Sequence, residues 1–435
     1  MMKWFPKLLQ SFLSKEDADM KKLLIKNASE VVTCKGKAPK RGKEMSELGI
    51  LENGSVLVSD GIIEDVGTFE EIAKRNDISD AEVIDAVGRA LLPGFIDCHT
   101  HLIFGGYRAD EFNWRLKGMS YMEIMEKGGG IVNSVTDTRN ATKEELIKEA
   151  MKRLFSMLSF GVTTCEAKSG YGLDFDNEIK QLEVIRELNN LQYVELVPTY
   201  LGAHSIPKEY KKEESGKYID FIIEKMLPYI KEHDLAKFVD IFVEKNVFSV
   251  EEGEKLLSAA KEMGFKTKVH ADEIVTLGGA ELAAKMGSVS AEHLLHISDK
   301  GIEDMAEKGV IADVLPCTAF NLKEPYAPAR KMIDAGCAVA VATDFNPGSC
   351  FCENISLAFL LSVLNMGMTV EEAVNAITIN AASSICMEDR IGSIEKGKQA
   401  DFVLLEFPSY IYLPYHLGTS SIEKVIKKGR VVFER

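Results

Sequence analysis

Between residues 94 and 343 the chain alternates short apolar runs with longer amphipathic segments. Eight of the runs have the length and composition of buried strands. They span residues 95–101, 162–166, 193–200, 238–243, 266–270, 289–293, 310–315 and 338–343. Segments with helical periodicity lie between several of them, among others at 143–160, 177–191, 250–263 and 278–286. Eight strands that alternate with helices predict an α/β fold, a parallel (β/α)8 TIM barrel.

A doubly wound parallel sheet is the alternative for the same alternation. A dinucleotide-binding sheet of that type carries Gly-x-Gly-x-x-Gly after its first strand, and this chain has no such motif there. The run Gly128-Gly-Gly130 is not followed by Lys-Ser or Lys-Thr, so we interpret it as a flexible loop and not as a phosphate-binding loop. The barrel remains the better interpretation.

Both ends of the chain differ from this alternating pattern, because they contain mainly β-prone runs. Within residues 22–90 two β-prone runs meet at Asp60-Gly61, a strong hairpin signal. After helical segments at 353–364 and 369–382, β-prone runs return at 392–405 and 422–433. We therefore predict a small composite β-sandwich domain from residues 22–92 plus 391–435, with the barrel, residues 93–390, inserted between them. Residues 1–21 are predicted to be a non-secretory N-terminal extension, to which we assign no function.

Charge and composition narrow the class of partner. The chain has 52 Lys and Arg against 67 Asp and Glu, a net charge of −15, which argues against nucleic acid or an anionic membrane as the main partner. No apolar run reaches the ~18–20 residues of a membrane span. The eight cysteines are scattered and no secretory signal precedes them, so we expect free thiols and a cytoplasmic location. A small-molecule substrate fits these constraints.

Histidines gather where a barrel enzyme keeps its chemistry. In a (β/α)8 barrel the active site lies at the C-terminal ends of the strands. Five of the eight histidines fall at predicted strand ends: His99, His101, His204, His270 and His293. His99 and His101 stand two residues apart, which in a strand turns both imidazoles to one side. A scattered set of core or surface histidines would rarely show this arrangement.

Three of these histidines and one carboxylate form a plausible metal site. We predict His99, His101, His270 and Asp344 as ligands of one Zn²⁺ or Fe²⁺, since imidazole and carboxylate suit both. Such an ion lowers the pKa of a bound water from 15.7 toward about 7, which makes hydroxide available as a nucleophile.

Nearby side chains predict how protons and substrate are handled. Glu273 is expected to accept the proton of the water and return it to a leaving nitrogen. His293 is expected to orient the water or stabilise the developing oxyanion. Arg108 follows the first strand and is a candidate for a bidentate pair with a substrate carboxylate. Tyr171 follows the second strand and is expected to face the same pocket.

These residues resemble the amidohydrolase superfamily and, within it, the imidazolonepropionase family of histidine degradation. The resemblance rests on residues 99–108 with Glu111-Phe112, 120–125 with 128–131, 168–173, 201–204, 270–273 and 343–349, and it covers roughly residues 22–432. It implies a (β/α)8 barrel with a composite β-sandwich, a homodimer, and one Zn or Fe ion on the four ligands named above. It further implies the hydrolysis of 4-imidazolone-5-propanoate to N-formimidoyl-L-glutamate. Carried over by motif, the substrate and product contacts would be Arg108, Tyr171, His204, Glu273, Asn346, Gly348 and Ser349, with Glu273 and His293 serving the proton transfers.

Two other functions stay open at this point. A related amidohydrolase or deaminase that acts on another nitrogen heterocycle would release ammonia if it is a deaminase, whereas ring opening releases none. A non-catalytic barrel that acts through its surface would be expected to have an incomplete set of metal ligands, and here the set is complete.

Overall fold

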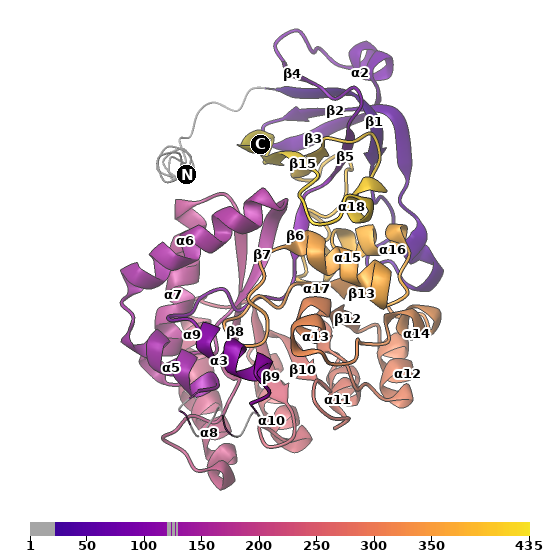
Figure 1. Ribbon diagram of the computed structural model, residues 1–435. Helices are drawn as coiled ribbons and strands as arrows, with labels where there is room; N and C mark the ends of the chain where they lie inside the picture. Colours follow the sequence, from indigo (N-terminus) through magenta and orange to yellow (C-terminus); the bar gives the residue numbers. More distant parts are fainter. Residues whose placement is uncertain (1–21, 120–122, 124–126, 128) are drawn as a thin grey trace.

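The computed structural model describes residues 22–119, 123, 127 and 129–435 (Figure 1). The predicted N-terminal extension lies outside the described residues, as do most of the motif at 120–125 and the first glycine of Gly128-Gly-Gly130. Among the described residues, no helix is long and apolar enough to cross a membrane.

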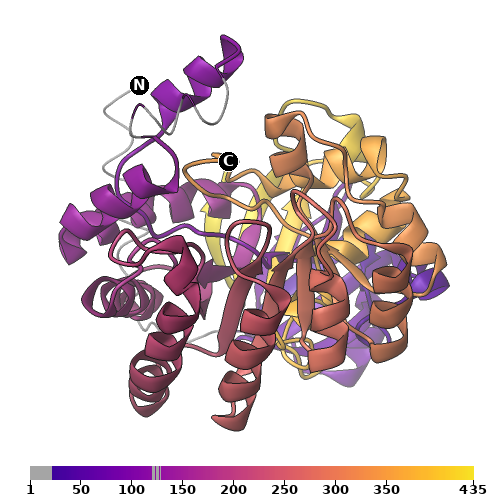
Figure 2. The ribbon, with the colours of Figure 1, turned by 90° about the horizontal axis from the view of Figure 1, so that it is seen from below.

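Eight parallel strands form the barrel, and Figure 2 shows the helices arranged around them. All eight predicted strands are present, in the spatial order of the sequence. They are β6 (Phe95–Asp97), β7 (Val162–Lys168), β8 (Glu195–Ala203), β9 (Phe238–Val243), β10 (Lys266–Ala271), β11 (Ser290–His293), β12 (Ile311–Val314) and β13 (Val339–Val341). The first strand is shorter than predicted: it ends at Asp97, so His99 and His101 follow the strand and do not lie within it.

The first and last strands are joined just beyond their C-terminal ends. The Asp97 carboxylate accepts hydrogen bonds from the Thr343 amide (3.1 Å) and hydroxyl (2.6 Å). The amide of Asp344 donates to the His99 carbonyl at 3.1 Å, and that of His101 donates to the Phe345 carbonyl at 2.9 Å. This closure brings the segment after β6 directly beside the segment after β13.

The helices follow the sequence pattern closely. Those that cover the first half of the barrel are α3 (Ala109–Leu116), α5 (Ile131–Asn140), α6 (Lys143–Ser159), α7 (Phe175–Leu191), α8 (Ser215–Phe221), α9 (Leu227–Glu232) and α10 (Val250–Glu262). Those that cover the second half are α11 (Gly279–Met286), α12 (Asp299–Lys308), α13 (Pro316–Leu322), α14 (Ala329–Asp334), α15 (Ile355–Asn365), α16 (Val370–Ala376) and α17 (Ile379–Ser384). Capping boxes at Thr142 and Ser249 fix the starts of α6 and α10. The single helix predicted over 369–382 is wrong: Thr378 has φ −125° and ψ −97°, and this non-helical residue separates α16 from α17.

A second sheet is built from both ends of the chain. Its strand order is β16-β15-β14-β5-β1-β2-β3, with β4 also paired to β1. The strands are β1 (Leu23–Val32), β2 (Ile50–Ser59), β3 (Ile62–Thr68), β4 (Glu82–Asp85), β5 (Ala90–Pro93), β14 (Phe402–Leu405), β15 (Ile422–Lys427) and β16 (Arg430–Glu434). The short helices α2 (Phe69–Arg75) and α18 (Tyr412–Tyr415) accompany it. The predicted turn at Asp60-Gly61 joins β2 to β3 with φ of 49° and 75°, as a two-residue hairpin requires.

The two sheets meet at Gly94, which divides one apolar run between them. Residues before Gly94 pair with β14 in the second sheet, and residues after it begin the barrel. A Cβ at Gly94 would lie 2.4 Å from the Thr163 hydroxyl, so the close passage of the chain at this point requires glycine. The second sheet has an apolar core of its own, which includes Ile25, Val56 and Phe402. The domain boundaries 22–92, 93–390 and 391–435 stay a prediction.

Candidate active site

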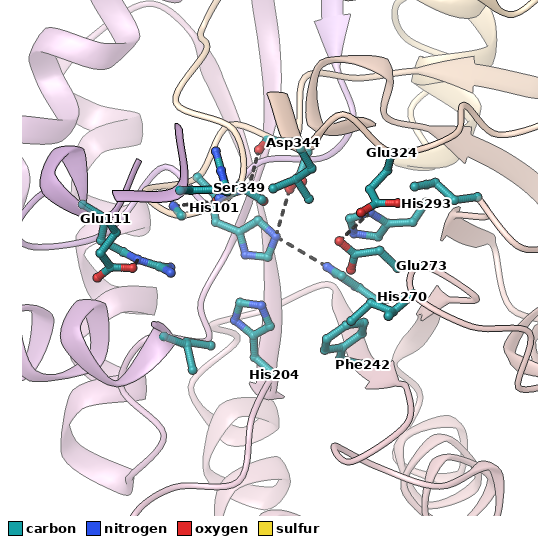
Figure 3. A pocket seen from close by; sticks show the side chains of 18 of the residues that line it. His101, Glu111, His204, Phe242, His270, Glu273, His293, Glu324, Asp344 and Ser349 are labelled. Carbon is teal, nitrogen blue, oxygen red and sulfur yellow. Dashed lines mark hydrogen bonds and ion pairs between the residues drawn. The ribbon is translucent and has the colours of Figure 1, made fainter. Parts of the chain in front are cut away.

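A cavity of about 460 Å³ opens at the C-terminal ends of the barrel strands (Figure 3). Eleven of the twelve predicted site residues line it. They are His101, Arg108, Tyr171, His204, His270, Glu273, His293, Asp344, Asn346, Gly348 and Ser349. The twelfth, His99, is fully buried beneath the cavity floor. The structure therefore brings together side chains that are up to 250 residues apart in the sequence.

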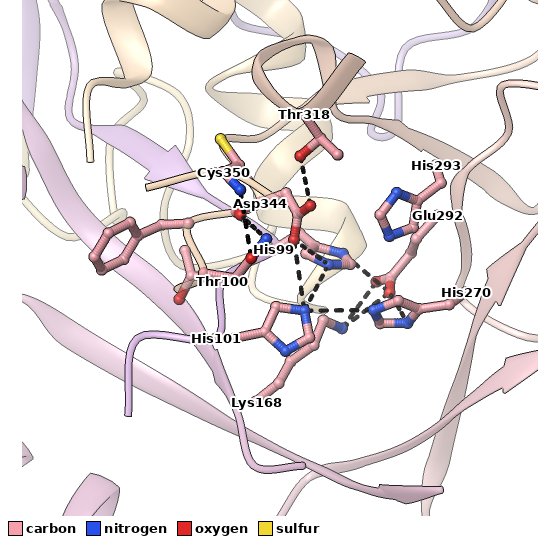
Figure 4. Close-up of polar contacts among 12 residues, drawn as sticks. His99, Thr100, His101, Lys168, His270, Glu292, His293, Thr318, Asp344 and Cys350 are labelled. Carbon is pink, nitrogen blue, oxygen red and sulfur yellow. Dashed lines mark hydrogen bonds and ion pairs between the residues drawn. The ribbon is translucent and has the colours of Figure 1, made fainter. Parts of the chain in front are cut away.

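Four donor atoms converge at the floor of this cavity (Figure 4). His101 Nε2 lies 3.3 Å from His99 Nε2 and 3.5 Å from His270 Nε2. Asp344 Oδ1 lies 3.4 Å from His99 Nε2 and 3.5 Å from His101 Nε2. Donors placed 2.0–2.2 Å from one ion at tetrahedral corners are separated by about 3.3–3.6 Å. His99, His101 and Asp344 have donor atoms at these separations, and His270 Nε2 adjoins them beside His101, so the four side chains are candidate ligands for one Zn-sized or Fe-sized ion.

The polar atoms of this set support the same interpretation. Asp344 Oδ2 accepts a hydrogen bond from the Thr318 hydroxyl at 2.5 Å, whereas the buried Oδ1 faces the imidazoles, with His99 Nε2 at 3.4 Å, and accepts no other hydrogen bond among the described residues. A buried carboxylate oxygen without a donor is costly unless a cation satisfies it.

The charges at the floor are strongly coupled. Burial lowers the pKa of His99, but the carboxylates of Glu292 and Asp344 raise it more, to about 10. Burial raises the pKa of Asp344, and the hydrogen bond and charge of His99, together with the charge of His293, outweigh this and lower it to about 2. A cation on His99 Nε2 must displace a proton, so metal binding is linked to pH.

Glu273 is held beside the donor set by a turn that the neighbouring carboxylate builds. Asp272 has φ of 51°, and its side chain accepts hydrogen bonds from the amides of Leu277 (2.7 Å), Gly278 (3.0 Å) and Ala280 (3.1 Å). Glu273 Oε1 then lies 3.7 Å from His293 Nδ1. Burial raises the pKa of Glu273 to about 8, and the charge of Asp344 adds to the rise. A carboxyl group with this pKa can both accept and return a proton near neutral pH.

Backbone conformation at the strand ends is unusual. Asp344 and His293 have φ of 55° and 72°, in the left-handed region that L-residues rarely occupy. Residues held in this way cost of order 1–3 kcal/mol each and persist only where the surroundings fix them. At both positions the unusual backbone turns the side chain into the cavity.

Arg108 lies on the opposite wall from His293, at the start of α3. Its Nε donates to Glu111 Oε2 at 2.8 Å, and Glu111 also accepts from the Gly130 amide at 3.0 Å. A Cβ at Gly348 would lie 2.1 Å from Arg108 Nη1, so glycine makes room for the guanidinium. A second arginine, Arg115, lines the same cavity, and within the part of the chain that the structure describes its buried Nη2 has no hydrogen-bond partner. This wall is therefore suited to an anionic group.

Aromatic rings form the wall between Arg108 and the donor set. His204 stacks on His101 with ring centroids 4.9 Å apart, and its Nδ1 donates to the Gly170 carbonyl at 3.0 Å. Tyr171 is 3% exposed and lies 5.4 Å from the ring of His204. Phe242 continues this surface on the other side of His204. A flat heterocycle finds apolar ring faces here, with the donor set at its edge.

Asn346 lines the cavity, but its amide serves its own loop. Its Oδ1 accepts from the amides of Gly348 and Ser349, each at 2.8 Å. Its Nδ2 donates to the Asp344 carbonyl at 2.7 Å and to the Ser349 hydroxyl at 2.8 Å. Asn346 therefore fixes the loop that carries Ser349 and the glycine beside Arg108.

Sequence reasoning missed a set of charged residues under the cavity floor. These are Glu166, Lys168, Asp240, Lys268, Glu292 and Asp313, all 0% exposed. The available signal was a charged residue inside runs that otherwise read as buried strands, as in Glu166-Ala-Lys168 and Lys268-Val-His270.

Comparison with known proteins agrees with this geometry. A sequence model of the Amidohydrolase family matches residues 90–432. Imidazolonepropionase from Clostridium tetani is 55% identical over 413 residues, which cover 95% of this chain and 98% of that protein. Imidazolonepropionase from Parabacteroides distasonis is 52% identical over 410 residues, which cover 94% and 98%. The chain belongs to the imidazolonepropionase family of amidohydrolases.

Solved structures with low sequence identity share the fold. A triazine hydrolase variant superposes with a TM-score of 0.73 at 16% identity, over 95% of each chain. Atrazine chlorohydrolase from Arthrobacter aurescens TC1, complexed with zinc, superposes with a TM-score of 0.71 at 17% identity, also over 95% of each chain. The prediction of a (β/α)8 barrel with an additional β-sheet domain is confirmed, and the chain is a hydrolase of the amidohydrolase type.

Proposed function

We propose that this protein hydrolyses the ring amide of 4-imidazolone-5-propanoate and releases N-formimidoyl-L-glutamate. The observation that carries the proposal is identity of 50–55% to proteins named imidazolonepropionase along nearly the whole chain. The cavity supports it, because an anion-binding wall, a wall of ring faces and a set of metal-type donors occur in one space.

We propose that His99, His101, His270 and Asp344 hold one ion, Zn or Fe, in each subunit. Bound there, the ion supplies an activated water at neutral pH. The donor set alone does not distinguish the two metals, because imidazole and carboxylate ligands suit both.

The substrate would lie between the two walls. Arg108, held by Glu111, receives the propanoate carboxylate, and Tyr171 and His204 flank the ring. Ser349 and Gly348 bound the space on the side of the loop that Asn346 fixes. This placement turns the ring amide toward His101 and Asp344 at the floor.

Proton transfers are assigned to Glu273 and His293. Water adds across the ring amide: the C–N bond breaks, oxygen joins the carbonyl carbon, and one proton passes to the leaving nitrogen. Glu273 takes that proton from the water and delivers it, a role that its pKa of about 8 suits. His293, buried beside Glu273, polarises the carbonyl oxygen as negative charge develops there. No electron is transferred and no ammonia leaves.

We also propose a homodimer and a cytoplasmic location. All eight cysteines are free, which agrees with a reducing compartment. Sedimentation at several protein concentrations tests the oligomeric state, and a monomer throughout would refute the dimer.

The testing experiment is the ultraviolet loss of freshly generated 4-imidazolone-5-propanoate, run with and without a chelator and beside an ammonia assay. We expect chelator-sensitive loss without ammonia. Glu273→Gln is the matched control, because it removes the proton carrier and leaves the four donor residues in place. Loss accompanied by stoichiometric ammonia would indicate a deaminase, and no loss by a metal-loaded protein would refute the substrate assignment.

A further inference from the structure

Two lysines and four carboxylates are enclosed inside the barrel beside the donor set. Figure 4 shows two of them, Lys168 and Glu292, next to His99 and His270. Lys168 Nζ lies 3.0 Å from Glu166, 2.9 Å from Asp240 and 3.0 Å from Glu292. Lys268 Nζ lies 3.0 Å from Glu292 and 3.3 Å from Glu166, with Asp313 at 3.5 Å. None of these six side chains is exposed.

One carboxylate oxygen in this cluster contacts both a buried lysine and two of the candidate metal-ligand histidines. Glu292 Oε2 lies 3.0 Å from His99 Nδ1 and 3.2 Å from His270 Nδ1. The same oxygen lies 3.0 Å from Lys168 Nζ. His270 Nδ1 also lies 2.9 Å from Asp240 Oδ2. The Nδ1 of His99 therefore faces Glu292, the Nδ1 of His270 faces both Glu292 and Asp240, and the Nε2 atoms of both rings face the donor set.

We propose that Glu292 is a positioning residue that fixes the tautomer and orientation of His99 and, together with Asp240, of His270 for metal binding. A neutral imidazole carries one N–H, and the nitrogen that donates it leaves the other with a lone pair for a ligand bond. When Nδ1–H donates to the carboxylate, Nε2 is the free nitrogen in both rings. Lys168 and Lys268 hold Glu292 charged and in place from below. The inference rests on the proposed metal site, but it does not depend on the identity of the substrate.

Because Glu292 is fully buried, its carboxylate requires the two lysines as partners. A buried carboxylate is costly unless cations or hydrogen-bond donors surround it. The Nζ of each lysine lies 3.0 Å from a Glu292 oxygen, and this pairing fixes the carboxylate in place. The cluster thus keeps an anion below the histidines at a position that water cannot reach.

Glu166 offers a matched control for a merely structural role. It touches the same two lysines, at 3.0 Å and 3.3 Å, and is equally buried. It makes no ion pair with either histidine among the described residues, and its remaining hydrogen bond comes from the Thr199 hydroxyl at 2.5 Å. Removing its charge perturbs the lysine cluster as much as removing that of Glu292, without touching an imidazole.

The experiment measures zinc affinity by competition with a chromophoric chelator, for the metal-stripped wild type, Glu292→Gln and Glu166→Gln. Loss of a carboxylate partner behind a ligating histidine typically weakens metal binding by about 10- to 100-fold. We expect that loss for Glu292→Gln and less than about threefold for Glu166→Gln, with similar unfolding midpoints for the two metal-free variants. Equal weakening in both variants, or none in Glu292→Gln, would overturn the proposal.

A second measurement needs no variant and covers the case in which Glu292→Gln does not fold. In the zinc-loaded wild type, ¹⁵N chemical shifts of the imidazoles should show protonated Nδ1 and metal-bound Nε2 at both His99 and His270. Metal-bound Nδ1 at either residue, or a wild type that binds no zinc, would refute the proposal. Neither readout uses substrate, so a failed imidazolone assay beside a positive result here would refute the proposed reaction and leave the positioning role intact.

Discussion

The glycine beside Arg108 gives a sharp test of how this cavity recognises an anion. In Gly348→Ala the added Cβ would lie 2.1 Å from Arg108 Nη1 and 2.9 Å from Cζ. The backbone at Gly348 is not left-handed, so alanine itself is tolerated there. Ordinary contact begins near 3.4 Å, and the end of the guanidinium must therefore shift by about 1.3 Å.

The expected rise in KM follows from the hydrogen bond to the substrate carboxylate that this shift breaks. Arg108 Nε stays on Glu111 at 2.8 Å, so the guanidinium pivots about that bond and Nη1 moves away from the substrate. A hydrogen bond to a charged group contributes about 1.5–3 kcal/mol, and each 1.4 kcal/mol is tenfold in affinity. Loss of one of two such bonds predicts a rise in KM of about 10- to 100-fold. We expect kcat within about threefold of wild type, because the floor residues are not moved.

The assay is the imidazolone-loss assay at varied substrate concentration, with a double-mutant cycle as its control. Arg108→Gln alone should raise KM at least as much, and adding Gly348→Ala to it should change nothing further, since the clash has lost its partner. Bound metal and unfolding midpoint should match wild type in all three variants. An unchanged KM in Gly348→Ala, or additive effects in the double variant, would refute the assignment of Arg108 as the anchor.

Three further predictions concern the floor and the scaffold. Glu273→Gln should lower kcat by about 10²- to 10⁴-fold with metal content unchanged; a variant with normal kcat would remove Glu273 from the proton transfers. In the wild type, kcat should fall as the pH drops below the pKa of Glu273, because only the carboxylate form accepts a proton. Burial raises that pKa to about 8 and a nearby cation lowers it toward 4.5, so the fall in kcat should lie between these two pH values. The pH dependence should be absent in Glu273→Gln. Ser249→Ala removes the capping box of α10 and should lower the free energy of unfolding by about 1 kcal/mol in a denaturant titration, with KM unchanged; no loss of stability would show that the cap is not needed.

Much of the fold was readable because period and length separate its two kinds of element. The eight barrel strands and the helices α6, α7, α10 and α11 lie within a few residues of their predicted positions. The short first strand was not readable, since the apolar pattern continues past Asp97 while the backbone hydrogen bonds of His99 and His101 go to the segment after β13. The break at Thr378 was also hidden, because two short buried helices show the same apolar run as one long helix.

The candidate site divides in the same way. The histidines and the aspartate at strand ends can be recognised in the sequence, because such residues are rare in apolar runs. The partners that hold them do not: Glu292 and Lys168 read as ordinary polar positions until the barrel closes around them. The left-handed backbone at His293 and Asp344 was likewise not predicted: Asp and His are enriched at positive φ, but most residues of both types have negative φ.

The candidate metal ligands and the candidate anion-binding residues lie on different parts of the fold. The donor set and its carboxylate supports lie on strands and strand ends that closure of the barrel fixes, and the same fold occurs in a triazine hydrolase at 16% identity. Arg108, Glu111 and Gly348, by contrast, lie on connections beyond the strands, where a single change alters the anion site without moving the floor. We therefore expect the barrel to position the candidate metal ligands and its loops to select a propanoate-bearing ring. We therefore expect variants of Arg108, Glu111 or Gly348 to change KM for substrates of different charge without changing kcat or zinc affinity. Variants of Glu292 should change kcat and zinc affinity without changing KM.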